Sequence, residues 1–191
     1  MNSHSRTTAE QAQADTQRWL ERAVIGLNLC PFAKAVHVRG QIHYALYLPD
    51  EEGSLIDALL DEARALAARG ASERDTTLLI APNTLADFLD FNDFTARAER
   101  SLARAGFAGQ FQLASFHPRF QFTGTEPEDI TNATNRAPYP TLHLLRENSV
   151  SRAVEAFPDA HAIFGRNMQI LQQLGPEGWA ALDVGPSGAQ R

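Results

Sequence analysis

The middle of the chain switches repeatedly between two hydrophobic patterns, and this order limits the folds that are open to it. Three segments have the patterns of strands: the alternating residues 42–49, the continuous apolar run 76–82 (TTLLIAP), and residues 111–118 (FQLASFHP). Apolar residues at helical spacing lie between them, at 54–69 and at 84–105. The order strand–helix–strand–helix–strand favours right-handed crossovers between parallel strands.

We therefore predict an α/β fold with a small, at least partly parallel sheet that is packed with helices. A two-layer α+β arrangement is the alternative. A helix at 9–29 should end before Pro31, because a proline disfavours helical geometry in the residue before it. Two more helices are expected after the third strand, at about 141–156 and 166–174.

The length and composition indicate one domain that works in the cytosol. A chain of 191 residues suits a single domain, which we place at 9–184 with disordered tails at 1–8 and 185–191. The net charge of −6, with dispersed basic residues, argues against a nucleic-acid partner. The single cysteine excludes an intrachain disulfide and fits a reducing compartment. The polar N-terminal sequence and the lack of long apolar runs predict neither a signal peptide nor a membrane span.

Polar side chains follow each of the three predicted strands, in the sequences LPDEE, APNT and FHPRF. If the strands are parallel, their carboxyl ends lie along one edge of the sheet, which is where open α/β sheets bind ligands. This edge would gather the side chains of Asp50, Glu51, Asn83, His117 and Arg119.

Cys30 lies in the sequence NLCPFAKAV, where a new helical turn would make it the N-cap and Pro31 the first helical residue. The positive end of the helix dipole would then lower the pKa of the thiol. Lys34, the one lysine beside sixteen arginines, could lower it further. The alternative is that Cys30 is a small core side chain continuing the apolar stripe from Leu27, and that the lone lysine reflects genome composition.

His117 stands where the third strand emerges from the core, and its ordinary pKa lies near neutral pH. It could therefore act as a general base or contact an anion, or it could only cap the strand with hydrogen bonds. The loop 117–140 that follows is longer than a compact domain needs for a connection, and long ordered loops are often functional.

Within this loop, Asn132, Asn135 and Arg136 supply donors that suit a carboxylate or a phosphate. Prolines on both sides of Tyr139 would hold these donors in place. The alternative is a turn that leads into the helix at 141–156, with Arg136 paired to Glu128 or Asp129. On that helix, His143 would share a solvated face with Arg146 and Glu147.

No metal or cofactor is predicted. Asp87, Asp90 and Asp93 lack the alternate spacing and the glycine of an EF-hand loop, and they suit the start of a helix instead. The histidines form no HExxH motif or clustered pair. The sequence also contains no GxGxxG, no P-loop and no GxSxG motif.

Four segments, GLNLCPFAKAV, DFNDF, QLASFHPRFQF and TNRAPYPTLHLLRE, resemble the bacterial family catalogued as domain of unknown function 1415. The likeness runs from about Trp19 to Val154. That family has no established activity, so the resemblance implies a bacterial, cytosolic, single-domain protein and no role for any residue. The family usually has serine at the position of Ala137 and often tyrosine at that of Ala133, so a mechanism that needs either side chain is in doubt here.

From these residues we predict a small-molecule enzyme that acts on an anionic substrate at the strand-end edge. His117 would move the proton, and Cys30 would be a nucleophile if it reaches the same pocket. The predicted residues are Cys30, His117 and Lys34 for catalysis and Arg136, Asn132, Asn135, Tyr139 and Arg119 for substrate binding. The alternatives are a non-catalytic ligand-binding or regulatory domain, and a protein-interaction module that uses the loop 117–140.

Overall fold

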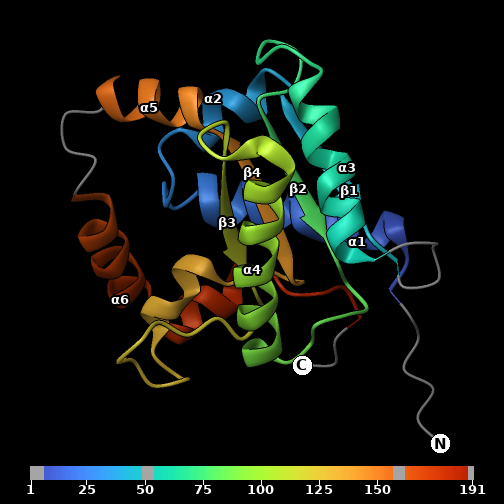
Figure 1. Ribbon diagram of the computed structural model, residues 1–191. Coiled ribbons are helices and arrows are strands. Elements are labelled where there is room, and N and C mark those ends of the chain that lie inside the picture. The colour runs from blue at the N-terminus through green and yellow to red at the C-terminus, as the bar shows by residue number, and fades with distance from the viewer. Residues whose placement is uncertain (1–6, 49–53, 157–161, 189–191) are drawn as a thin grey trace, which may run out of the picture.

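A four-stranded mixed sheet forms the centre of the protein in the computed structural model, which describes residues 7–48, 54–156 and 162–188 (Figure 1). The strand order is β1-β2-β4-β3, with β1 parallel to β2 and β4 antiparallel to both of its neighbours. The α/β prediction, with a partly parallel sheet packed with helices, is therefore confirmed. The strands are β1 (Ile42–Leu46), β2 (Thr76–Ile80), β3 (Phe111–Phe116) and β4 (Thr141–Arg146).

The strand β4 is the main departure from the predicted secondary structure. We expected one helix over 141–156, but its first six residues form a central strand and α5 (Glu147–Ala156) begins only after them. The sequence TLHLLR alternates, so that Leu142 and Leu144 enter the core on one face while His143 points to the other face. His143 therefore lies in the sheet and not on a solvated helix face.

The predicted edge of the sheet exists, although β3 does not pair with β2. Because β4 is antiparallel to both β2 and β3, the strands β1, β2 and β3 run in the same direction. Their carboxyl ends share one edge, to which Asn83, His117 and Arg119 belong. Asp50 and Glu51 lie outside the described residues.

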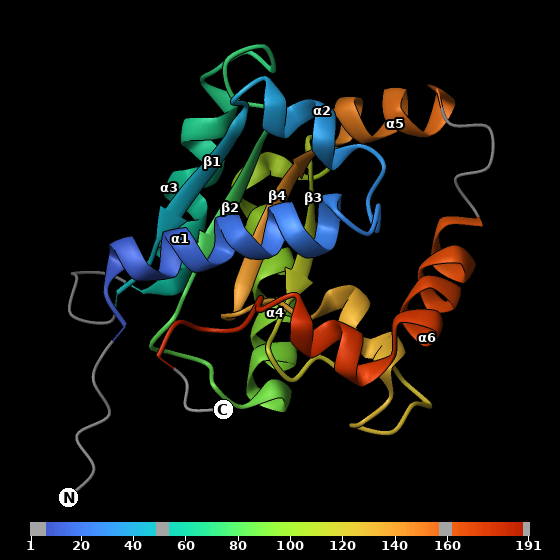
Figure 2. The same cartoon turned by 180° about the vertical axis from the view of Figure 1, so that it is seen from behind.

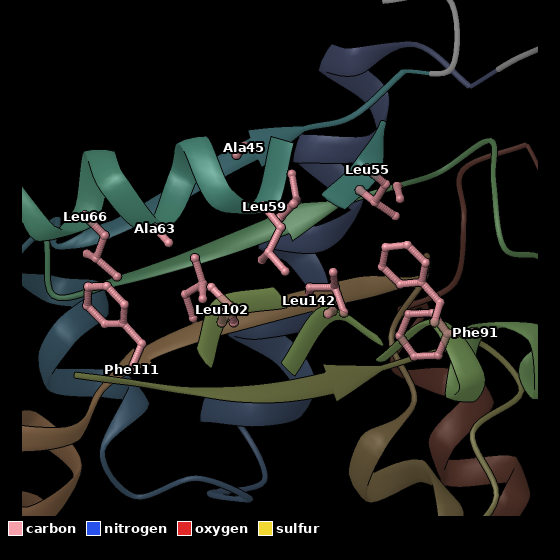
Figure 3. Packing of buried hydrophobic residues seen from close by; sticks show 14 residues of the cluster. Ala45, Leu55, Leu59, Ala63, Leu66, Phe91, Leu102, Phe111 and Leu142 are labelled. Atoms are coloured by element: carbon pink, nitrogen blue, oxygen red, sulfur yellow. The ribbon is translucent and has the colours of Figure 1, made fainter. Parts of the chain in front are cut away.

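One face of the sheet is covered by α3 (Leu55–Ala67) and α4 (Phe88–Leu102), and it is filled by fourteen buried side chains (Figure 3). A capping box between Ser54 and Asp57 starts α3. The side chain of Asp87 caps α4, so this helix starts later than the predicted residue 84. This face is a conventional close-packed core.

The other face is crossed by α1 (Ala9–Trp19) and its π-helical continuation η1 (Leu20–Ile25), as Figure 2 shows. Two short elements, α2 (Ala33–Val38) and α5, lie side by side near one end of the sheet (Figures 1 and 2). The helix predicted at 166–174 is longer in the structure.

That helix, α6 (Ile163–Ala181), packs on the 3-10 turn η3 (Ile130–Asn135) and bends at Gly175, whose φ is 68°. The remaining helical segment, η2 (Ala103–Phe107), continues α4. Within the described part of the chain, every helix is too short or too polar to cross a lipid bilayer.

Candidate ligand cavity

A cavity of about 580 Å³ lies on the α1 face of the sheet. Its walls come from α1 and η1, from residues 30–39, from α5, from Ile42 of β1 and from alternate residues of the other three strands. Most of these side chains are apolar, including Trp19, Val24, Phe116 and Val150. Small-molecule sites are commonly clefts of about 300–1,000 Å³ with mainly hydrophobic walls, so size and lining both fit such a site.

The cavity arises because the helices over this face do not fill the space above the strands. The strands present small or polar side chains here, among them Ala114 and Thr76. The helix α5 turns Val150 and Ala153 toward the cavity, yet none of its residues is fully buried. It therefore covers the sheet without packing against it closely.

His143 is a wall residue of this cavity and lies in the central strand β4. Its Nε2 is hydrogen-bonded to the hydroxyl of Thr76, and that hydroxyl donates to the carbonyl of Leu144 at 2.6 Å. A hydroxyl has only one proton, so the imidazole must be the donor toward Thr76. Burial lowers the pKa of His143 to about 4, which leaves the ring neutral at pH 7.

Cys30 lines the same cavity, but its environment differs from the expected one. The thiol is half-buried, and the backbone amides of Phe32 and Ala33 favour its thiolate form. Burial nevertheless raises the pKa of Cys30, because removal from water disfavours the thiolate more than these two donors favour it. The expected lowering was therefore wrong. The N-cap of α2 is Phe32, and Cys30 does not occupy it.

The other two predicted catalytic residues do not line this cavity. Lys34 is exposed on α2, and His117 lies at the strand-end edge. Among the described residues no hydrogen bond joins Cys30 to either histidine, so the cavity holds a thiol and an imidazole without a preformed ion pair. A nucleophilic role for Cys30 stays a prediction.

His117 is 1% exposed, and both of its ring nitrogens have partners within the protein. Its Nε2 is 3.0 Å from the carbonyl oxygen of Leu85, and its Nδ1 accepts the backbone amide of Arg119 at 3.0 Å. The ring packs beside Phe88 and Phe91, and burial lowers the pKa of His117. The imidazole thus joins three segments of the edge, while its role in proton transfer stays a prediction.

The side-chain amide of Asn132 is likewise hydrogen-bonded within its own loop. Its Oδ1 accepts from the backbone amide of Phe122 at 2.9 Å and from the hydroxyl of Thr125 at 2.8 Å. Its Nδ2 donates to the carbonyl of Glu126 at 2.8 Å. The side chain is 0% exposed, so it holds the loop from inside.

The remaining predicted binding residues likewise contact the protein itself. Arg136 donates to the backbone carbonyls of Phe120 and Pro127, and Asn135 donates to that of Ser115 at 3.3 Å.

The other two are Tyr139 and Arg119. The Tyr139 hydroxyl donates to the buried carboxylate of Asp15 at 2.7 Å. Arg119 donates to the carbonyl of Ala86 and lies 3.5 Å from the carboxylate of Asp87. Anion binding by the loop stays a prediction.

The mouth of the cavity is polar and carries two arginines. Arg152, exposed on α5, donates to the hydroxyl of Ser149 at 3.1 Å, and Ser149 donates to Asp75 at 2.6 Å. Arg39, exposed at the end of α2, donates to Gln41 at 2.9 Å. Within the described ranges, no three histidine, cysteine or acidic side chains are grouped as a metal site would require.

The sequence reasoning missed His143 as a site residue, together with the cavity. The strand alternation in TLHLLR was the signal that could have placed this histidine inside the molecule. The cavity had no such signal, since it depends on how closely α1 and α5 approach the sheet.

Comparison with known proteins gives a family and no further relatives. Neither a search of curated proteins nor a search of solved structures finds a match to this chain. The model of one family, described as a protein of unknown function (DUF1415), matches residues 11–181. The chain therefore belongs to the DUF1415 family, as its sequence motifs predict.

Proposed function

We propose that this protein binds an apolar small molecule in the cavity between α1, α5 and the sheet. The observation that carries the proposal is a space of about 580 Å³ with mainly apolar walls, which lies directly against all four strands on the face opposite the largest buried cluster. Apolar walls favour an apolar ligand, because transfer of its surface from water into the cavity is favourable. This matches the ligand-binding alternative from the sequence, with the site moved from the loop to the sheet.

Titration with N-phenylnaphthylamine, an apolar dye that fluoresces in dry surroundings, tests this proposal. Two variants on α5 give a matched pair: Ala153→Trp, at a cavity-lining position, and Ala156→Trp, at an exposed position outside the lining. The native protein and Ala156→Trp should bind the dye equally well. Ala153→Trp should weaken binding at least about tenfold by filling the space. Equal binding by both variants would refute a site in this cavity.

A second candidate is an enzyme that uses the Cys30 thiol on a molecule bound in the same cavity. It is favoured by the position of the one cysteine of the chain in the cavity wall. An anionic substrate would meet Arg39 and Arg152 at the mouth. Cys30→Ser separates the two candidates, since dye binding survives in both cases and turnover is lost only with the enzyme.

We also propose that the protein works in the bacterial cytosol. The single cysteine, which fits a reducing compartment, supports this location. The net charge of −6 supports a small-molecule partner over nucleic acid.

A further inference from the structure

Nδ1 of His143, in the wall of the cavity, is an acceptor that no described residue satisfies. We infer that the ligand is an apolar molecule bearing a hydroxyl group, an alcohol or a phenol, whose hydroxyl donates to Nδ1 of His143. This inference rests on the proposed function and adds the chemical class of the ligand.

The hydrogen bonds of Thr76 fix which ring nitrogen is the acceptor. The threonine hydroxyl gives its proton to the carbonyl of Leu144, so Nε2 of His143 must carry the proton that it shares with Thr76. In a neutral imidazole the other nitrogen, Nδ1, then has a lone pair and no proton. The tautomer is therefore determined by the neighbouring strand β2.

The accessibility of Nδ1 shows where its partner would come from. Nδ1 makes no hydrogen bond to any described residue, and it is not completely buried. It thus keeps accessible surface although His143 lies in a central strand, and the cavity that the ring lines provides that surface. A purely apolar ligand would cover this lone pair and leave it without a donor, which is unfavourable.

The other groups that line the cavity limit which chemical group of a ligand can donate to Nδ1 of His143. A carboxylate has no proton to give, and the arginines that would pair with it are exposed at the mouth. An ammonium group would lose its hydration among apolar walls. An amide would bring a carbonyl that needs a strong donor of its own, whereas the Thr76 proton is already used and the Cys30 thiol is only a weak donor. A hydroxyl gives one proton and tolerates an unpaired oxygen, so it fits best.

Displacement of N-phenylnaphthylamine by β-naphthol and by its methyl ether tests the inference, because the two competitors differ mainly in the hydroxyl proton. The native protein should bind β-naphthol about tenfold more tightly than the ether. In His143→Phe, which keeps a flat ring without the acceptor, this preference should disappear. Circular dichroism checks that the variant is folded.

A measurement on the native protein serves if the variant does not fold. The ¹⁵N chemical shift of Nδ1 in His143 should move on addition of β-naphthol and stay unchanged with the ether. Equal affinity for both competitors would overturn the hydroxyl inference and leave the cavity as a binding site. Tighter binding of β-naphthoate than of β-naphthol would also overturn it, in favour of an anion at the mouth. Failure of the dye itself to bind would refute the proposed function, and the inference with it.

Discussion

The two faces of the sheet differ although they share the same four strands. On the α3 and α4 face, side chains of the strands and helices pack together (Figure 3). Leu144 belongs to this cluster and is 0% exposed. On the α1 face, the next residue of the same strand, Leu145, borders a cavity. The comparison indicates that the α3 and α4 face carries the largest buried cluster, while the α1 face combines smaller buried clusters with room for a ligand.

The largest expected effect comes from truncating these two neighbours. Leu144→Ala removes a fully buried side chain and leaves a new void, so it should lower the free energy of unfolding by about 3 kcal/mol. Leu145→Ala only enlarges an existing space and should cost about 1 kcal/mol. Urea denaturation of both variants measures the difference. Equal losses would show that the two faces are packed alike.

The protonation of His143, on the α1 face, should make the stability of the protein depend on pH. Burial lowers its pKa from 6.5 to about 4, so below pH 6.5 the unfolded chain binds a proton that the native ring does not. Stability should fall as the pH drops from 6.5 to 4. The native protein should lose about 2 kcal/mol more than His143→Phe over this range. Parallel curves for the two proteins would contradict the proposed burial of a neutral ring.

The substitution Asn132→Ala tests whether the loop at the strand-end edge only stabilises the fold or also belongs to the ligand site. Asn132→Ala leaves the backbone amide of Phe122 and the hydroxyl of Thr125 without their acceptor. We expect a loss of about 1–2 kcal/mol in the free energy of unfolding. The affinity for N-phenylnaphthylamine should not change. A weaker dye affinity in a folded variant would connect the loop to the cavity.

The smallest effect is expected for Arg119, whose side chain is exposed at the same edge. The guanidinium of Arg119 lies 3.5 Å from the carboxylate of Asp87, and both side chains are exposed to solvent. Arg119→Ala should therefore change the free energy of unfolding by less than about 0.5 kcal/mol. Dye binding should be unchanged. A marked loss of affinity for an anionic compound in this variant would instead support the predicted anion site at the edge.

Much of the fold could be predicted because the patterns are local. The alternation in residues 42–49 predicted β1, and the run TTLLIAP predicted β2. The helical spacing between the strands predicted α3 and α4. The strand β4 was missed because a segment of six residues after Pro140 was read together with the helix that follows it. Only its pairing with both β2 and β3 shows that it completes the sheet.

The candidate site was less accessible to sequence reasoning. Polar residues such as Asn132 and Arg136 suggested a site, but their partners are backbone carbonyls and amides, which no side-chain pattern reveals. Cys30 was identified from the sequence, and the structure places it in the wall of a cavity. The cavity depends on the distance between helices and sheet, which is a property of tertiary packing.

Alkylation of Cys30 by N-ethylmaleimide, with and without saturating N-phenylnaphthylamine, shows whether the cavity holds a ligand. The chain has one thiol, so the signal needs no assignment. If the dye occupies the cavity that Cys30 lines, it should slow the reaction at least about tenfold. Without dye, the midpoint of the pH profile should lie above the free-thiol value of about 8.5, because burial raises the pKa of Cys30. A rate that is unaffected by bound dye would contradict a ligand site at this cavity.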